Sequence, residues 1–167
     1  LILTASRTKE VLDATWQEID EVENLWVLPV ERTKTGREHR VPLTTRMKEI
    51  LSEAKSLSPH AELVFSSPTT GRSLSYNTLL HVLQKRIGSE ATVHGFRSSF
   101  KDWAAETTNF LNEVSEMALS HKISNPVEAA YRRGDLLEKR RALMNAWEDF
   151  LCNPGKNIVA VDFKSQR

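Results

Sequence analysis

The hydrophobic pattern of the chain begins with a helix and then changes period. Residues 7–14 have the spacing of a short helix, with Ser6 as its predicted N-cap and Glu10 in its early turns. Short runs of aromatic and branched residues, typical of strands, follow at 16–19, 25–28 and 39–43. Before the last run, Gly36 suits a turn that needs a positive φ. The pattern predicts a small antiparallel sheet whose hairpin tip carries Lys34.

Helical periodicity dominates the remainder of the chain. Helices are expected, in chain order, at 44–57, 79–87, 95–105, 111–119, 125–134 and 136–150. Thr44 is the predicted N-cap of the first, Gly88 ends the second, and Asp135 with Glu138 resembles a capping box at the start of the last. Beyond these helices, residues 158–163 alternate in the manner of a strand.

These elements predict an α+β fold that is mainly α, with one small antiparallel sheet. Residues 1–152 form one predicted domain, and residues 153–167 a C-terminal tail that supplies a strand or an exchange arm for another subunit. The chain begins Leu1-Ile2-Leu3, which resembles the end of an apolar element. We therefore expect that an N-terminal part is missing.

Composition narrows the class of protein without identifying a function. The 167 residues are 40% hydrophobic and 27% charged, and the single cysteine excludes an internal disulfide framework and a Cys-based zinc site. No apolar run is long enough for a membrane span and no targeting segment is visible, so a cytoplasmic protein is expected. Lys and Arg number 23 against 22 Asp and Glu, a net charge of +1, so any basic surface must be local.

Two segments concentrate positive charge. One contains Arg32, Lys34, Arg37 and Arg40, and the other extends from 132 to 141. A run of charges is most often a solvated face of the protein. Neither cluster alone therefore indicates a ligand.

His94 and Arg97 stand three residues apart at the start of a predicted helix. That spacing puts an imidazole and a guanidinium on one helix face. The guanidinium fork fits two phosphate oxygens, and the imidazole can exchange a proton near neutral pH. Taken alone, such a pair is more often a capping histidine and a surface arginine.

Four segments carry further candidate residues in a characteristic order. They are an arginine block at 7–20, a lysine hairpin at 33–43, a His-x-x-Arg box at 93–97, and a terminal block made of 118–122 and 129–133. Together they resemble the catalytic domain of tyrosine recombinases, the phage integrase family, over residues 1–151. The run at 138–147 is similar to the subgroup found in prophages and genomic islands. Ser6 and Ser120 stand where many members carry Gly.

The resemblance implies that Tyr131 attacks the scissile phosphate. The products would be a 3′-phosphotyrosyl link and a free 5′-hydroxyl. Arg7 and Arg97 would hold the two non-bridging oxygens, a task that suits a planar guanidinium better than an ammonium. His121 would add a hydrogen bond to the phosphate.

The resemblance also implies roles for the remaining basic residues. Lys34 would protonate the departing 5′-oxygen, and His94 would help to deprotonate the phenol, whose ordinary pKa is about 10. Arg32 and Arg37 are expected to contact DNA. Glu10 is expected to orient a neighbouring basic side chain rather than to react.

The implied function is site-specific DNA recombination for integration or excision of a mobile element. Expected partners are double-stranded DNA attachment sites, other integrase subunits, and accessory DNA-bending or directionality proteins; the expected location is the bacterial cytoplasm, in association with the nucleoid. No metal is expected because arginines supply the positive charge. No nucleotide cofactor is expected because the phosphotyrosine conserves the bond energy.

Two other functions stay open on the sequence alone. One is a DNA-relaxing enzyme similar to type IB topoisomerases, and the other is a catalytically silent DNA-binding remnant.

Several aromatic and histidine residues also have structural interpretations. Tyr131 could be a buried core residue instead of the nucleophile, whereas Tyr76 has no basic residues next to it in the sequence and is not expected to be the nucleophile. Structural or surface positions are expected for His39, His60 and His81, and core positions for Trp16, Trp26, Trp103 and Trp147.

Overall fold

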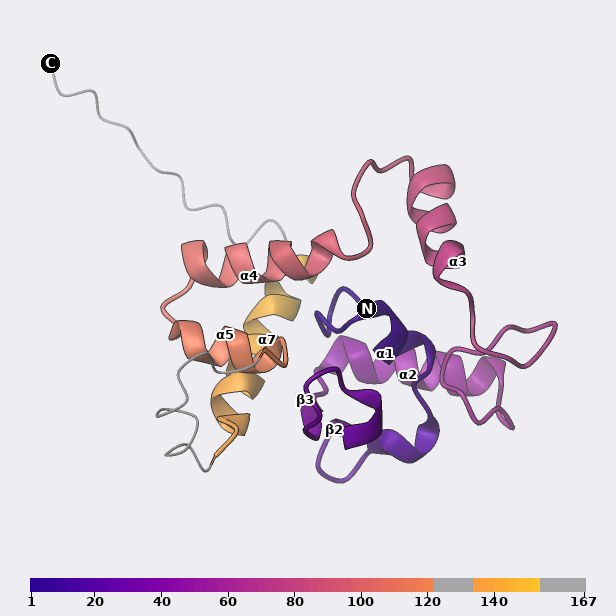
Figure 1. The fold of residues 1–167 in the computed structure, drawn as a ribbon, viewed down its shortest axis with the longest axis horizontal. Coiled ribbons are helices and arrows are strands. Elements are labelled where there is room, and N and C mark those ends of the chain that lie inside the picture. Colours follow the sequence, from indigo (N-terminus) through magenta and orange to yellow (C-terminus); the bar gives the residue numbers. More distant parts are fainter. Residues whose placement is uncertain (122–133, 154–167) are drawn as a thin grey trace, which may run out of the picture.

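The computed structural model of the chain describes residues 1–121 and 134–153 and shows the predicted α+β fold (Figure 1). Its elements are α1 (Thr8–Leu12), β1 (Ile19–Asp20), β2 (Leu25–Leu28), β3 (His39–Pro42), α2 (Thr45–Leu57), α3 (Tyr76–His81), α4 (Gly95–Thr107), α5 (Asn112–Ala118) and α7 (Leu137–Cys152). Helices α4, α5 and α7 lie on one side of the molecule, and α1, α2 and the sheet on the other (Figure 1). Residues 125–133 of one predicted helix and the whole strand predicted over 158–163 fall outside the described residues.

Strands β1, β2 and β3 form the predicted antiparallel sheet, in that order. Trp26 pairs with Val41, and Leu28 pairs with His39, so these four side chains share one face of the sheet. All four are buried, with Leu28 fully enclosed. The connection from β2 to β3 turns at Gly36, whose φ of 66° confirms the predicted turn glycine.

Two predictions beside the sheet are wrong in detail. Trp16 begins a 3-10 turn (Trp16–Glu18) rather than a strand, and this turn directs Glu18 inward to accept a hydrogen bond from Trp26 Nε1 at 2.9 Å. The N-cap of α1 is Arg7 rather than Ser6, because Glu10 Oε2 accepts the backbone N–H of Arg7 at 2.8 Å.

The predicted capping box at Asp135 and Glu138 is also wrong. Leu136 is the N-cap of α7, and the Asp135 carboxylate binds Arg40 Nη2 at 2.7 Å and the guanidinium of Arg140. Arg140 is 1% exposed and also donates to the Arg40 carbonyl. A guanidinium this deeply buried requires an anionic partner. The Asp135 carboxylate therefore pairs with Arg140 instead of capping α7, because the pairing is worth more free energy than a helix cap. The network fastens α7 to β3.

Two predicted helix ends are confirmed. Thr44 is the N-cap of α2, and its hydroxyl donates to Glu148 of α7, whose Oε2 also accepts the backbone N–H of Arg46 at 2.8 Å. The helical run that starts with α3 continues through a π-helical turn (Val82–Arg86) and ends at Gly88, where φ is 73°. Because Glu148 belongs to α7, the first of these caps also joins the two sides of the molecule.

Aromatic side chains of α4 and α7 form the centre of the core. The ring of Trp147 lies 5.4 Å from that of Phe100 and 4.9 Å from that of Trp103, measured between centroids. Trp26, Trp103 and Trp147 are buried as predicted, and Trp16 packs against the same cluster at its edge.

Within residues 1–121 and 134–153, no helix combines the length and the apolar character that crossing a membrane requires.

His39 is a buried structural residue, one of the two positions expected for it. It is 9% exposed, and its ring hydrogen-bonds the backbone of Ala118. Burial lowers the pKa of His39 to about 4, and the positive charge of Arg140 acts in the same direction. The unfolded chain would bind a proton here below about pH 6.5, whereas the folded chain keeps the ring neutral. The stability that this neutral ring contributes is therefore complete above that pH and is lost as the pH falls toward 4.

We predict that this residue lowers the free energy of unfolding by about 2 kcal/mol between roughly pH 7.5 and pH 5. A His39→Gln variant should lose that part of the pH dependence, whatever its absolute stability, in urea unfolding at each pH. His60→Gln is the matched control because His60 is exposed. The pH dependence of the wild type persisting in the His39→Gln variant would contradict the prediction.

Candidate active site

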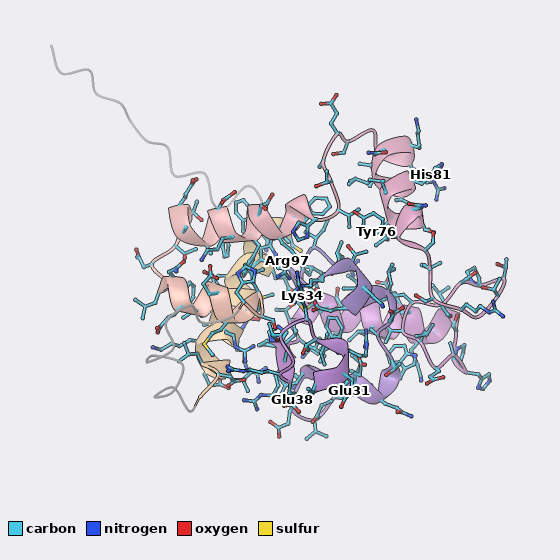
Figure 2. The ribbon with its side chains drawn as sticks, in the orientation of Figure 1. Glu31, Lys34, Glu38, Tyr76, His81 and Arg97 are labelled. Carbon is cyan, nitrogen blue, oxygen red and sulfur yellow. The ribbon has the colours of Figure 1, made fainter. Side chains whose placement is uncertain are left out.

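One open cleft brings together five of the side chains singled out in the sequence. It has a volume of about 680 Å³ and is lined by Arg7, Lys34, His94, Arg97 and His121, together with Thr35, Ser98, Lys101, Asp102, Leu119 and Ser120. Figure 2 shows Lys34 and Arg97 in the middle of the molecule, whereas Tyr76 and His81 lie on the separate helix α3. Tyr131, the sixth predicted residue, lies outside the described residues.

Arg7 is held by the helix that it begins. Its Nη1 donates to Glu10 Oε1 at 2.8 Å, and its Nη2 donates to the Ser120 carbonyl at 3.3 Å. Glu10 thus contacts a basic neighbour, as expected. The carboxylate binds both the backbone and the side chain of Arg7, so the direction of the guanidinium is fixed by α1 itself.

Arg97 is the most buried cation of the cleft, with 7% of its surface exposed. Its guanidinium donates to the Ala5 carbonyl and, at 2.7 Å, to the Leu119 carbonyl. Burial lowers the pKa of Arg97 to about 10, with the charge of Arg7 adding to the effect and Glu10 opposing it. The group therefore stays positive at neutral pH, and a guanidinium has five N–H donors, so some remain for a ligand.

Two carbonyls that bind these arginines come from residues in the left-handed region. Ala5 has φ of 47° and binds Arg97, while Ser120 has φ of 51° and binds Arg7. Side chains other than glycine adopt this region at a cost. Both residues nevertheless adopt this strained conformation, and in it their carbonyls accept hydrogen bonds from the two arginines.

His121 is oriented by a carboxylate on α5. Its Nδ1 lies 2.7 Å from Glu116 Oε2, and its Nε2 lies 3.4 Å from Arg97 Nη2. Glu116 also pairs with Lys101 Nζ at 2.6 Å. Partial burial by itself raises the pKa of Glu116, but hydrogen bonds from Lys101 and His121 bring it below its ordinary value. The carboxylate therefore remains charged and directs His121 Nε2 toward Arg97.

Lys34 and His94 line the cleft from two different elements. Lys34 is exposed on the connection from β2 to β3, which Thr33 Oγ1 closes by donating to the Arg37 carbonyl at 2.7 Å. His94 is exposed at the N-cap of α4, three residues before Arg97, as the spacing predicted. Both side chains can therefore meet a ligand that enters the cleft.

The two residues expected to contact DNA have different surroundings. Arg32 donates to Glu18 and, at 2.7 Å through Nη2, to the Glu10 carbonyl, so its guanidinium ties the base of the hairpin to α1. It lines a smaller hollow beside the cleft, which Arg7 and Lys34 share. Arg37 is exposed on the same hairpin. The DNA contact of both residues stays a prediction.

Sequence reasoning missed Lys101, Asp102 and Glu116. The sequence could have predicted Lys101, because it follows Arg97 by one helical turn and so lies on the same face of α4. Glu116 lies five residues before His121, and its pairing with both basic groups depends on how α5 packs against α4. Among the described residues, no three His, Cys, Asp or Glu side chains are placed to hold a metal ion.

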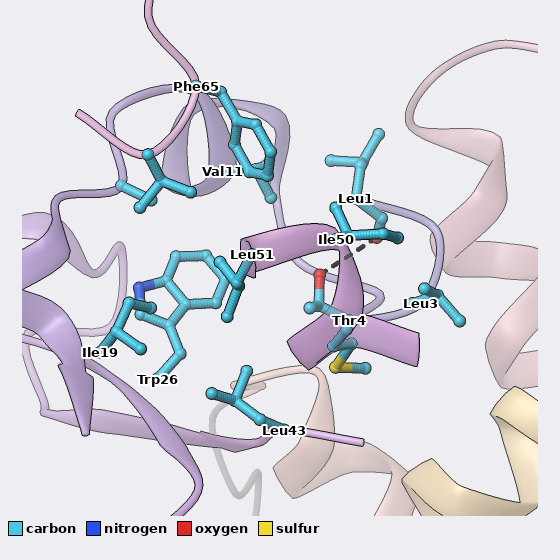
Figure 3. A pocket seen from close by; sticks show the side chains of 13 residues that line it. Leu1, Leu3, Thr4, Val11, Ile19, Trp26, Leu43, Ile50, Leu51 and Phe65 are labelled. Atoms are coloured by element: carbon cyan, nitrogen blue, oxygen red, sulfur yellow. Dashed lines mark hydrogen bonds between the residues drawn. The ribbon is translucent and has the colours of Figure 1, made fainter. Parts of the chain in front are cut away.

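A second pocket has a different chemistry (Figure 3). It is small, about 60 Å³, and its lining is almost wholly apolar, with Trp26, Leu51 and Phe65 among the residues that form it. The hydroxyl of Thr4 lies there but donates to the Leu1 carbonyl at 3.2 Å. Of these two cavities, only the larger cleft is lined by basic side chains that can donate hydrogen bonds to a phosphate.

The cleft is suited to an anion that gains charge during a reaction. Arg7, Lys34, Arg97 and Lys101 line it, against one lining carboxylate, Asp102. Donors fixed in advance stabilise developing negative charge most strongly, because they need not reorganise when it forms. The two arginines are fixed in that way.

Comparisons with known proteins agree in pointing to one family. The sequence profile of the phage integrase family matches residues 1–135. Prophage integrase IntA of Escherichia coli (strain K12) is 35% identical over 152 residues, and prophage integrase IntZ of the same strain is 32% identical over 151. The integrase of Enterobacteria phage P4 is 29% identical over 167 residues. No solved structure matches the chain significantly.

The aligned regions cover most of this chain but little of each relative. They include 90% of the chain for IntA, 89% for IntZ and 90% for the phage P4 integrase. They include 37%, 37% and 38% of those relatives, respectively. The chain therefore spans less than two fifths of their length.

We predict that Glu10→Gln lowers the free energy of unfolding by about 2 kcal/mol, because the buried Glu10 carboxylate holds both the backbone and the partly exposed side chain of Arg7. Urea unfolding at neutral pH measures the change. Glu49→Gln is the control: Glu49 also pairs with an arginine three residues away, but on an exposed face of α2, so its loss should leave stability nearly unchanged. Equal effects of the two substitutions would contradict the prediction.

Proposed function

The chain belongs to the phage integrase family, and from that premise we propose that it is the catalytic part of a site-specific DNA recombinase. Tyr131 cuts a DNA strand by forming a 3′-phosphotyrosyl link and rejoins it to a new 5′-hydroxyl. The reaction serves integration or excision of a mobile element.

The observation that carries this proposal is the shared cleft. Arg7, Lys34, His94, Arg97 and His121 come from segments far apart in the sequence, yet all line one open hollow. A cavity of about 680 Å³ leaves room for a sugar-phosphate linkage and the side chain that attacks it. The family profile covers every one of these positions.

In the proposed reaction the arginines bind the phosphate before it reacts. Arg97 and Arg7 each donate to one non-bridging oxygen, using donors that are not engaged by backbone carbonyls or by Glu10. Negative charge on those oxygens increases as the tyrosyl oxygen approaches, so both interactions are stronger in the transition state than before it. His121 adds a hydrogen bond to the phosphate when both ring nitrogens carry a proton, with Nδ1 donating to Glu116 and Nε2 to the phosphate.

Two side chains carry out the proton transfers of the proposed reaction. Lys34 on its hairpin donates a proton to the departing 5′-oxygen, and His94 at the start of α4 assists removal of the proton from the Tyr131 phenol. Because the phosphotyrosine retains the energy of the broken linkage, the second strand can be joined by reversing the same steps. Arg32 and Arg37 contribute to binding the DNA backbone near the hairpin.

The proposed partners follow from strand exchange. The substrate is double-stranded DNA that contains attachment sites, and the enzyme acts in the bacterial cytoplasm at the nucleoid. Exchange between two sites needs further integrase subunits and accessory DNA-bending or directionality proteins. Relatives named integrases favour recombination over simple relaxation of DNA. The intact set of cleft residues supports a reactive enzyme rather than a silent DNA-binding remnant.

We predict that Tyr131→Phe abolishes the covalent adduct on a nicked suicide duplex that carries the element's own attachment sequence. Denaturing gel electrophoresis and mass mapping of the linked peptide measure the result. Tyr76→Phe is the matched control: Tyr76 is the other tyrosine of the chain and lies on α3, so its substitution should leave the yield unchanged. An adduct formed by the Tyr131→Phe variant at the wild-type rate would refute the assignment.

We predict that Arg97→Lys slows adduct formation by roughly 100-fold or more, since one ammonium cannot donate to the phosphate and to two carbonyls in the fixed geometry of a guanidinium. Single-turnover cleavage measures the rate, and thermal unfolding shows how far the loss of carbonyl contacts affects the fold. Arg46→Lys, on an exposed face of α2, should change neither. Cleavage by the Arg97→Lys variant within about twofold of wild type would contradict this role.

A further inference from the structure

The turn that carries His121 also contacts the hairpin that carries Lys34. Thr35 Oγ1 and Ser120 Oγ lie 3.4 Å apart, a long hydrogen bond between residues separated by 85 positions. The carbonyl of the same Ser120 accepts a hydrogen bond from Arg7 Nη2. Ser120 thus contacts the hairpin through its side chain and an arginine of the cleft through its backbone.

Ser120 occupies this position at a conformational cost. Its φ of 51° lies in the left-handed region, which glycine adopts freely and serine does not. A glycine would direct the same carbonyl at Arg7 without that cost. What serine adds at this position is the hydroxyl, and the hydroxyl meets Thr35.

The hairpin is otherwise fixed at its base. Arg32 binds Glu18 and the Glu10 carbonyl, and Thr33 closes the turn onto the Arg37 carbonyl. Lys34 lies beyond these contacts and is exposed. Beyond this base, the hydrogen bond from Thr35 links the hairpin to Ser120, another residue that lines the cleft.

We propose that Ser120 and Thr35 are positioning residues whose hydroxyl pair holds the hairpin with the Lys34 ammonium over the cleft. The inference rests on the proposed function, since it assigns proton delivery to Lys34. In that step the bond from phosphorus to the 5′-oxygen breaks as the bond to the tyrosyl oxygen forms. The phenol proton passes to His94, and a proton passes from Lys34 Nζ to the 5′-oxygen. Neither hydroxyl touches a reacting atom.

The catalytic test compares two leaving groups. One suicide duplex has the ordinary 5′-oxygen at the scissile linkage, and the other has sulfur there, which departs as a thiolate without needing a proton. Ser120→Ala and Thr35→Val should slow cleavage of the oxygen substrate roughly fivefold, or about 1 kcal/mol at 1.4 kcal/mol per tenfold change. Both should cleave the sulfur substrate within about twofold of wild type.

Two further variants distinguish the hydroxyl pair from a general effect on the fold. Thr35→Ser keeps the hydroxyl and should retain the wild-type rate. The double variant Ser120→Ala with Thr35→Val should be no slower than either single variant, because both remove the same contact. Equal slowing on both substrates, or additive effects in the double variant, would overturn the proposal.

Amide hydrogen exchange of the protein without DNA tests the contact independently of the chemistry. Amides of residues 34–38 should exchange roughly fivefold faster in Ser120→Ala and Thr35→Val than in wild type or Thr35→Ser. Ser120→Gly should loosen the hairpin as much as Ser120→Ala does but unfold at a higher temperature than Ser120→Ala, since both lack the hydroxyl and only glycine relieves the left-handed strain. Unchanged exchange in the hairpin would overturn the inference. A loosened hairpin in a protein that never forms the adduct would support the contact and reject the recombinase function instead.

Discussion

A guanidinium enclosed between two backbone carbonyls determines the geometry of the cleft. Removing the charge of Arg97 from water would be unfavourable by several kcal/mol without compensating partners. Those partners are the carbonyls of Ala5 and Leu119, which lie in segments before α1 and after α5. The cation that lines the cleft therefore also fixes three parts of the chain against one another. A cleft built in this way can exist only when all three are folded.

The same constraint accounts for backbone conformations that local preferences disfavour. Ala5 and Ser120 both have positive φ, at a cost of about 1 kcal/mol each for residues other than glycine. Their carbonyls bind charged donors, and such hydrogen bonds contribute about 1.5–3 kcal/mol. The interaction with the arginines is thus large enough to offset the local strain, and the strained residues lie where the cations need acceptors.

Sequence patterns predicted the elements that depend on neighbours along the chain, including the sheet, the N-cap at Thr44 and the shared face of His94 and Arg97. They failed where distant side chains meet. Asp135 resembles a cap residue locally, but it binds Arg40, which is 95 positions away, and the buried Arg140. Glu18 belongs to a turn because Trp26 and Arg32 donate to it from across the sheet and its hairpin. Such partners follow from packing, which a local pattern does not contain.

The near-neutral total charge is consistent with a positive cleft once the partners of the basic groups are considered. Glu10 binds Arg7, Glu116 binds His121 and Lys101, and Glu18 binds Arg32. Each carboxylate weakens the local field, yet each also fixes the direction of a cation before any ligand arrives. A phosphate that gains charge as it reacts is stabilised more by donors already in place than by a stronger field from mobile ones. The acidic residues that make the composition uninformative are therefore the same residues that fix the direction of these basic groups.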